Sequence, residues 1–170
     1  MKPILEIFTD GSCHTQQRVG AWASIILVNE QKIVLSGSEI ETTHNRMEIL
    51  AVLKAIHYVR ENYVDIGVIK LVLDSQYVIG LVKREGKFLR SNFKTSSGNE
   101  IRNKDLVVEL LNLVKEVEIR FEKIKAHQKK SDITKYNIEA DKLSRSIVRS
   151  IVKGVVTLPN LVSFDENVRP

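Results

Sequence analysis

Residues 68–74 read Val-Ile-Lys-Leu-Val-Leu-Asp, and this stretch decides the fold. An almost unbroken run of aliphatic residues is typical of a strand that is buried on both faces of a sheet. The segments on either side, 45–61 and 75–83, carry apolar residues at helical spacing. A buried strand between two helices indicates parallel strands joined by crossovers, so the sequence predicts an α/β protein.

The N-terminal part of the chain predicts an antiparallel meander, because its apolar runs are separated by short polar turns. Asp10-Gly11-Ser12 has the composition of a turn, so we expect the first strand to end at Asp10. Two further helices are expected over 106–117 and 138–152. With the buried strand, the pattern gives a five-stranded mixed sheet flanked by helices; its other strands are predicted at 3–10, 21–28, 32–40 and 118–125.

The composition is that of one folded domain, with 170 residues, 43% of them hydrophobic and 28% charged. Cys13 is the single cysteine, which indicates a reducing, cytoplasmic compartment. No apolar stretch approaches the roughly 18 residues that span a bilayer, and Glu6 and Asp10 interrupt the region where a signal peptide is apolar. We therefore expect neither secretion nor membrane insertion. The initiating methionine favours a free-standing chain, and we expect a monomer.

The net charge of +5 is concentrated in one segment. Residues 83–104 hold seven of the 26 basic residues and two of the 21 acidic ones, so the remaining 19 of each sign cancel. Charge clusters of this kind often form a solvated helix face. A basic segment on an otherwise neutral body also indicates an anionic partner such as nucleic acid.

Four acidic residues, Asp10, Glu48, Asp74 and Asp141, stand near the expected ends of strands and helices. Each has a purely structural explanation. Asp10 could belong to a turn, Asp74 could cap the helix that follows it, and Asp141 could favour a helix dipole. Glu48 follows Asn45 by three residues, which is the spacing of a capping box.

Taken together, the four acids predict a metal site. Two are expected at the ends of neighbouring buried strands, and two in the first turns of helices that pack over the same end. Carboxylates brought so close repel one another unless some are protonated or a cation neutralises them. Mg²⁺ and Mn²⁺ prefer such hard oxygen ligands, whereas the chain lacks a cysteine and histidine cluster for zinc.

The chain resembles type 1 ribonuclease H through five short runs that occur in order between residues 4 and 150. The resemblance implies a ribonuclease H-like fold with a five-stranded mixed sheet. It also implies hydrolysis of the RNA strand of RNA/DNA hybrids with two Mg²⁺ ions, Mn²⁺ being an alternative, to leave 5′-phosphate and 3′-hydroxyl ends. The five runs are Phe8-Thr9-Asp10-Gly11-Ser12-Cys13, Asn45-Arg46-Met47-Glu48, Asp74-Ser75-Gln76-Tyr77-Val78, Lys125-Ala126-His127 and 137–145, Asn-Ile-Glu-Ala-Asp-Lys-Leu-Ser-Arg.

The resemblance also assigns roles to individual residues. The metal ligands would be Asp10, Glu48, Asp74 and Asp141, and His127 would assist proton transfer or product release. Arg46 has two readings, a phosphate contact or an ion pair with an acid, and His44 stands where the family often has asparagine. The implied contacts to the nucleic acid are Ser12, His44, Asn45, Arg46 and Gln76 near the cleavage site, and Lys87, Arg90, Phe93, Lys94 and Asn103 in a basic protrusion.

The expected domain plan is one ribonuclease H domain over 1–152, with the basic protrusion at 83–104, followed by a C-terminal tail over 153–170. The loop at 14–20 and the lysine-rich stretch at 127–141 depart from the family pattern. Two other functions are weighed: a DNA nuclease of the same fold, such as a junction resolvase or a transposase-like enzyme, and a non-catalytic hybrid-binding module. The order of the five motifs argues against the first, and the presence of all four acids against the second.

Overall fold

A computed structural model describes residues 4–124, 134–155 and 161–165 of the chain. A mixed sheet forms the middle layer, with strands in the order β5-β4-β1-β2-β3-β6. The first three strands form the predicted antiparallel meander, and β4 and β5 run parallel to β1. The strands are β1 Leu5–His14, β2 Val19–Val28, β3 Gln31–Ile40, β4 Ile69–Leu73, β5 Ile119–Lys123 and β6 Leu161–Asp165.

The sixth strand was not predicted. β6 pairs antiparallel with the outer edge of β3, from Lys32 opposite Asp165 to Ser36 opposite Leu161. The pairing is made by main-chain groups, which every residue carries, so a short strand with weak apolar alternation leaves little trace in the sequence. Part of the expected tail is therefore a strand of the sheet.

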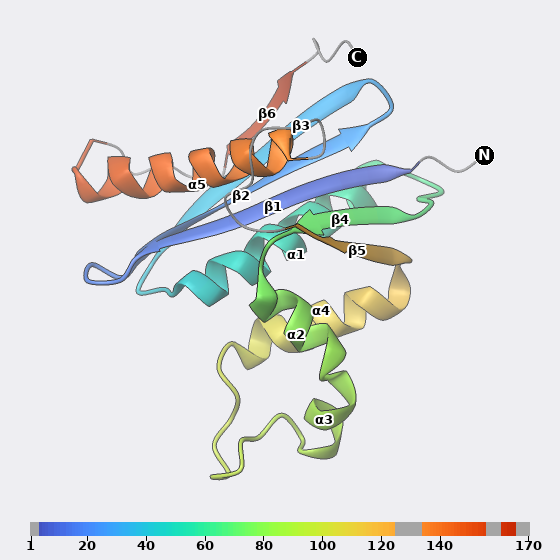
Figure 1. The fold of residues 1–170 in the computed structure, drawn as a ribbon, viewed down its shortest axis with the longest axis vertical. Helices are drawn as coiled ribbons and strands as arrows, with labels where there is room; N and C mark the ends of the chain where they lie inside the picture. The colour runs from blue at the N-terminus through green and yellow to red at the C-terminus, as the bar shows by residue number, and fades with distance from the viewer. Residues whose placement is uncertain (1–3, 125–133, 156–160, 166–170) are drawn as a thin grey trace.

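The helices cover the two faces of the sheet, and Figure 1 shows α5 on one face and α1 on the other. Alternate residues of β1 serve the two layers, because neighbouring side chains on a strand point in opposite directions. Ile7 packs in the larger core with α1, and Phe8 packs in the smaller core with Ala140 of α5. The helices are α1 His44–Asn62, α2 Gln76–Lys83, α3 Glu85–Arg90, α4 Lys104–Glu116 and α5 Lys135–Val152. None of them, within the residues described, is long and apolar enough to cross a membrane.

β1 does not end at Asp10 as predicted. It continues to His14 and stays paired with β2 throughout, whereas its pairing with β4 stops at Phe8 opposite Val72. Gly11 is needed for close packing and not for a turn. A Cβ atom at Gly11 would lie 2.5 Å from the backbone nitrogen of Glu48, so only glycine lets α1 approach the strand this closely.

The capping explanations for two of the acids are wrong. The N-cap of α1 is Thr43, whose hydroxyl accepts a hydrogen bond from the Arg46 backbone N–H at 3.3 Å. The N-cap of α2 is Ser75, whose hydroxyl accepts from the Val78 N–H at 3.2 Å. Since neighbouring residues satisfy both helix ends, Glu48 and Asp74 are not used as caps.

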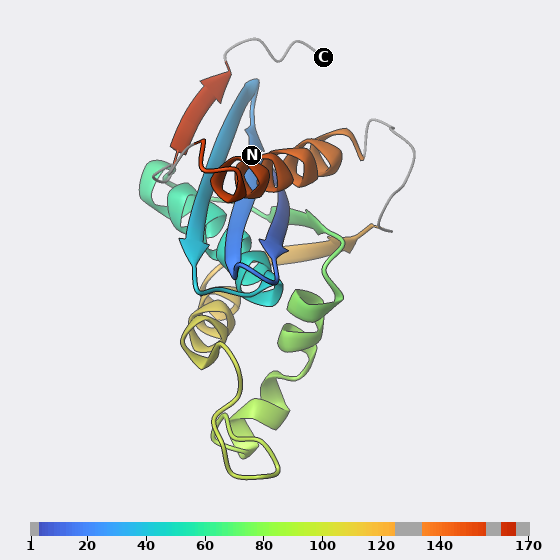
Figure 2. The same cartoon turned by 90° about the vertical axis from the view of Figure 1, so that its left-hand side faces the viewer.

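Residues 83–104 form an arm that projects from the body of the protein, and in Figure 2 α3 and the loop after it lie farthest from the sheet. Phe88 anchors the arm, because its buried ring belongs to the main core and stacks on Phe93 with 6.1 Å between centroids.

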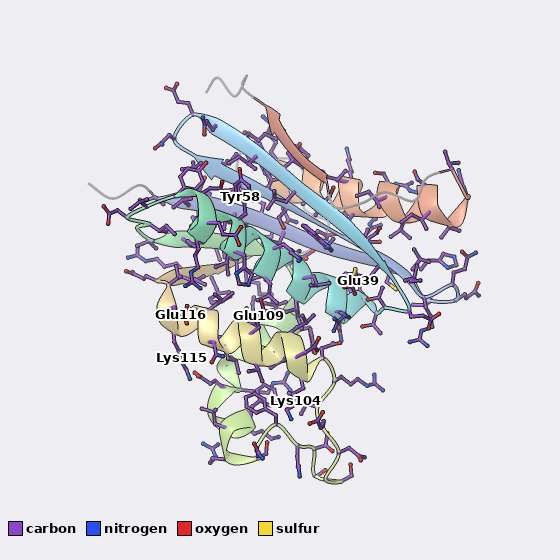
Figure 3. All side chains as sticks on the ribbon, turned by 180° about the vertical axis from the view of Figure 1, so that it is seen from behind. Glu39, Tyr58, Lys104, Glu109, Lys115 and Glu116 are labelled. Carbon is purple, nitrogen blue, oxygen red and sulfur yellow. The ribbon has the colours of Figure 1, made fainter. Side chains whose placement is uncertain are left out.

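α4 packs beside α1, where Arg60 contacts Glu116 at 2.8 Å. Figure 3 shows the acidic side chains Glu109 and Glu116 on α4.

Candidate active site

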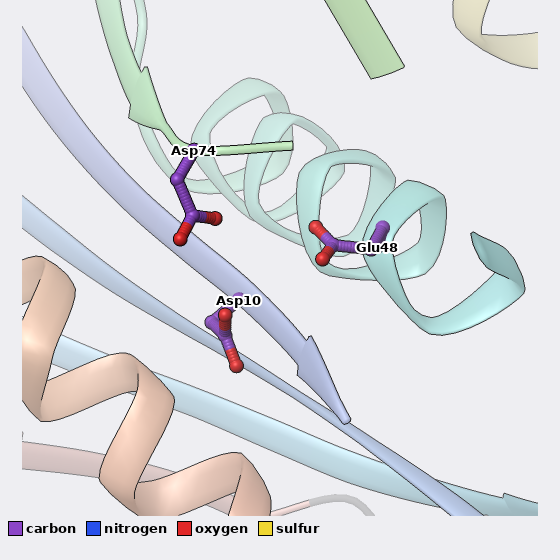
Figure 4. Close-up of side chains that lie close together, drawn as sticks. All are labelled: Asp10, Glu48 and Asp74. Atoms are coloured by element: carbon purple, nitrogen blue, oxygen red, sulfur yellow. The ribbon is translucent and has the colours of Figure 1, made fainter. Parts of the chain in front are cut away.

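Three of the four carboxylates that were expected to meet converge where β4 ends beside β1. Asp10 lies on β1, Glu48 in the second turn of α1, and Asp74 directly after β4, as Figure 4 shows. One oxygen from each residue lies within 4.8 Å of the others. The meeting is possible because β1 extends beyond β4, which leaves an open edge where groups from both faces of the sheet can approach one another.

The cluster lines an open cleft of about 950 Å³. Asp141 lines the same cleft, together with several of the residues that the sequence assigned to nucleic acid. The predicted residues in the lining are Asp10, Ser12, His44, Asn45, Glu48, Asp74, Gln76 and Asp141.

Burial makes this cluster electrostatically costly without a cation. Asp10 is only 5% exposed, and the loss of solvation raises its pKa from 3.8 to about 7. A hydrogen bond from Ser144 opposes this change, and the nearby carboxylates add to it. Burial also raises the pKa of Glu48, against the effect of His44, whose Nε2 lies 3.1 Å from Glu48 Oε1.

The residues of the cluster fit a divalent metal ion. Glu48 Oε2 is buried and has no hydrogen-bond partner among the described residues, which leaves a carboxylate oxygen unsatisfied in the wall of the cleft. The three grouped ligands are all carboxylates, the donors that Mg²⁺ and Mn²⁺ prefer over softer alternatives. A bound cation would satisfy the free oxygen and offset the repulsion among the acids.

Asp141 lies deeper in its helix than predicted. α5 begins at Lys135, so Asp141 is in the second turn and not in the first. Its Oδ1 accepts a hydrogen bond from Arg145 Nε at 2.6 Å, and it is not part of the three-residue group within 4.8 Å. The fourth acid therefore shares the cleft but is held by a cation of its own helix.

Arg46 and His127 stand apart from the other predicted site residues. Arg46 donates to both carboxylate oxygens of Asp105, at 3.0 and 3.2 Å, and its Nε contacts Glu39 at 3.0 Å. Of the two roles expected for Arg46, a phosphate contact or an ion pair with an acid, the structure shows the ion pair. His127 lies outside the described residues, between 124 and 134.

The predicted contacts of the arm differ in their surroundings. The side chains of Lys87, Arg90 and Lys94 are exposed, and among the described residues no hydrogen bond or ion pair of these side chains is seen. Phe93 is half-buried against Phe88. Asn103 has a left-handed backbone with a φ of 55°, and its amide donates to the hydroxyl of Tyr77 at 3.3 Å. The three exposed cations are therefore the groups best placed to meet an anion.

Sequence reasoning missed three α5 residues beside the acids. Asn137 lines the cleft with a buried Oδ1 that has no partner in the described chain. Arg145 also lines the cleft, and the hydroxyl of Ser144 contacts Asp10. Residues 137, 144 and 145 each lie three or four positions from Asp141, so they share a helix face with it. This helical spacing around Asp141 was the signal that could have found them.

Without metal, stability is expected to fall as the pH rises from about 4 to about 7. The folded pKa of Asp10, about 7, lies above its ordinary value of 3.8, so the folded state binds this proton more tightly than the unfolded state. The tighter proton binding contributes fully to the free energy of unfolding below about pH 4, and this contribution is lost as the pH rises through about 7. The total loss is at most roughly 4 kcal/mol, since each pKa unit corresponds to about 1.36 kcal/mol.

Urea unfolding in EDTA at pH 4.5 and pH 8 tests this linkage. Asp10→Asn carries a neutral side chain of the same shape, so we expect its advantage over wild type in the free energy of unfolding to be ~1–3 kcal/mol larger at pH 8 than at pH 4.5. An equal difference at both pH values would contradict the raised pKa of Asp10.

A cluster of carboxylates at the open edge of a buried parallel strand is the kind of site at which hydrolytic enzymes, nucleases and phosphatases among them, hold divalent metal ions. Comparison with known proteins identifies the family within this class. The family model for RNase H matches residues 2–149. The chain belongs to the ribonuclease H family.

Individual relatives support this membership. A ribonuclease H from Caldicellulosiruptor saccharolyticus is 32% identical over 153 residues, which cover 89% of this chain and 99% of the relative. A ribonuclease H from Wolbachia sp. subsp. Drosophila simulans is 34% identical over 148 residues, covering 86% and 97% of the two chains.

A solved structure agrees with the fold. LC9-RNase H1, described as a type 1 RNase H with the type 2 active-site motif, matches with a TM-score of 0.76 at 18% identity. The match covers 96% of this chain and 79% of that chain. It supports the ribonuclease H-like arrangement of sheet and helices.

Proposed function

We propose that this chain is an endoribonuclease that hydrolyses the RNA strand of RNA/DNA hybrids and leaves 5′-phosphate and 3′-hydroxyl ends. The observation that carries the proposal is the cluster of Asp10, Glu48 and Asp74, whose ligand oxygens lie within 4.8 Å of one another in a chain of this family. The cleft around the cluster is open to solvent, so a duplex can reach it.

The residues of the cleft have different proposed roles in the reaction. Asp10, Glu48 and Asp74 would hold the metal, with Asp141 as a fourth ligand from α5. When bound, two divalent ions supply an activated water and stabilise the charge that develops on the phosphate. His44 orients Glu48 through the contact at 3.1 Å between Nε2 and Oε1. His127 is proposed to assist proton transfer or product release.

Recognition of the hybrid is proposed to use two surfaces. Ser12, Asn45 and Gln76 line the cleft beside the acids, where they can contact sugars and base edges in the minor groove. The exposed cations of the arm would contact the phosphates of the DNA strand. Arg46 is already bonded to two acids, so its contribution is to fix the start of α1 beside α4.

Substrate choice separates this function from the two alternatives. Labelled RNA/DNA hybrid, double-stranded RNA and double-stranded DNA are each incubated with MgCl₂ or with EDTA. We expect cleavage of the hybrid RNA alone and only with metal. Cleavage of DNA would favour a DNA nuclease of the same fold, and hybrid that binds but stays intact would favour a binding module.

Neutralising the arm is expected to weaken binding and flatten its salt dependence. Each phosphate contact releases about 0.9 counterion on duplex DNA. Changing Lys87, Arg90 and Lys94 to Gln should therefore lower the slope of log KM against log salt by roughly 2 to 3, with kcat nearly unchanged at saturating hybrid. The control is Lys54→Gln with Arg120→Gln, which removes exposed charges outside the cleft lining. An unchanged slope in the arm variant would exclude phosphate contacts by these residues.

The cofactor, the assembly and the location of the protein are proposed on the same basis. Mg²⁺ is the proposed ion and Mn²⁺ the replacement, because the donor set contains hard oxygen atoms. The enzyme is proposed to act as a cytoplasmic monomer with its catalytic domain over 1–152. Size-exclusion chromatography with light scattering tests the monomer, and titration of cleavage with each ion tests the metal.

A further inference from the structure

We propose that Ser144 is a positioning residue of the active site, whose hydroxyl fixes the Asp10 carboxylate in the orientation that binds metal. The inference rests on the metal-dependent function proposed above. Ser144 Oγ donates to Asp10 Oδ2 at 2.6 Å, from α5 to β1. This length is that of a charge-assisted bond between a hydroxyl and a carboxylate. With Oδ2 held in this way, Oδ1 is left for a ligand in the cleft.

The Ser144 hydroxyl donates its hydrogen bond to Asp10 in preference to a carbonyl of its own helix. Ser144 Oγ also lies 3.1 Å from the backbone carbonyl of Asp141, which is a common contact for a helical serine. A hydroxyl carries one proton, so it donates to one of these two acceptors at a time. The shorter distance and the charge of the carboxylate both favour Asp10.

The surroundings of Ser144 make the hydroxyl unusual. Ser144 has 0% exposure, and it lies on the buried face of α5 together with Ala140, Ile147 and Val148. An apolar residue would suit such a face, since burying a hydroxyl without a hydrogen bond is unfavourable. The bond to Asp10 removes that penalty. These neighbours pack α5 onto the sheet, so helix packing and the hydrogen bond together fix the position of the hydroxyl.

The bond also connects the elements that supply the metal ligands. Asp141 lies three residues before Ser144, so the same turn of α5 that carries one acid fixes another. Without this bond, the carboxylate of Asp10 is free to rotate about its last side-chain torsion, which is broad for aspartate. Ordering that torsion before metal arrives lowers the entropic cost of binding.

Removing the hydroxyl is expected to weaken metal binding without affecting hybrid binding. We expect Ser144→Ala to raise the Kd for MnCl₂ and MgCl₂, measured by calorimetry on protein without substrate, by ~10-fold, the scale for loss of a residue that orients a metal ligand. At one subsaturating Mg²⁺ concentration, kcat should fall by a similar factor while KM for hybrid stays within about twofold. Ser144→Thr keeps the hydroxyl and should restore the metal Kd.

Ser24→Ala is the matched control. Ser24 is also 0% exposed and donates a bond of 2.6 Å, but to the backbone carbonyl of Ala51 and away from the cleft. Its loss should lower the melting temperature and leave the metal Kd unchanged. An equal rise of the Kd in Ser24→Ala and Ser144→Ala would overturn the positioning role.

A wild-type metal Kd in folded Ser144→Ala would also overturn it. If that variant does not fold, Ser144→Cys replaces it, because a thiol is a weak donor of similar size; a wild-type Kd there is equally decisive. Failure of this inference is distinct from failure of the proposed function, which would show as intact hybrid with wild-type enzyme and saturating Mg²⁺.

Discussion

Asp10→Asn is expected to abolish cleavage of the hybrid, with a loss of at least ~10³-fold in the single-turnover rate at saturating Mg²⁺. Asp10 is the proposed ligand in the middle of the cluster, because it is buried on β1 between Glu48 of α1 and Ser144 of α5. An amide of the same shape keeps the hydrogen bond from Ser144 but lacks the negative charge that attracts a cation. The fold should therefore remain while the chemistry is lost.

The measurement combines rapid-quench cleavage, thermal melting and binding of labelled hybrid in EDTA. The variant should melt at or above the wild-type temperature and bind hybrid normally. Asp65→Asn is the control, since the same chemical change occurs at an exposed loop position with a φ of 57°, where asparagine is tolerated. Turnover near the wild-type rate in Asp10→Asn would remove Asp10 from the metal ligands.

Gly11→Ala is expected to destabilise the protein by about 3 kcal/mol or more and to inactivate it. The added Cβ would lie 2.5 Å from the Glu48 backbone nitrogen and 2.6 Å from the Met47 carbonyl carbon. Both are main-chain atoms, so relief requires α1 to move away from β1. That movement carries Glu48 away from Asp10.

Urea unfolding and hybrid cleavage measure the two effects of Gly11→Ala. Gly80→Ala in α2 is the matched control, because its new Cβ would meet only the flexible end of Arg84 at 3.6 Å. Removing a glycine from a helix interior should stabilise the control by up to ~1 kcal/mol. A Gly11→Ala enzyme with the stability and rate of wild type would show that the contact between α1 and β1 is not needed.

Much of the site could be predicted from residue types and order. Asp74 follows an apolar run that is plainly a buried strand, and the ordered motifs link it to Asp10 and Glu48. The details that were wrong depend on contacts distant in sequence. Asp10-Gly11 has the local composition of a turn, but pairing with β2 keeps it in a strand. The glycine is required by α1, which a local pattern does not reveal.

The helix caps show a second limit of sequence reasoning. Thr43 and Asn45 are both good N-caps, as are Asp74 and Ser75, so local preference does not choose between such close neighbours. Similarly, the reading of Arg46 depended on Asp105, which is 59 positions away. The role of Ser144 also required knowing that α5 lies against β1 at Asp10.

The contact at Gly11 has a consequence for how the sequence of this protein can diverge. It fixes the separation of β1 and α1 through main-chain atoms, and these do not change when side chains are substituted. The spacing of Asp10 and Glu48 is therefore set by a main-chain contact and not by the shape of any one side chain between β1 and α1. The residue that sets the distance between the two acids is thus one that has no side chain of its own.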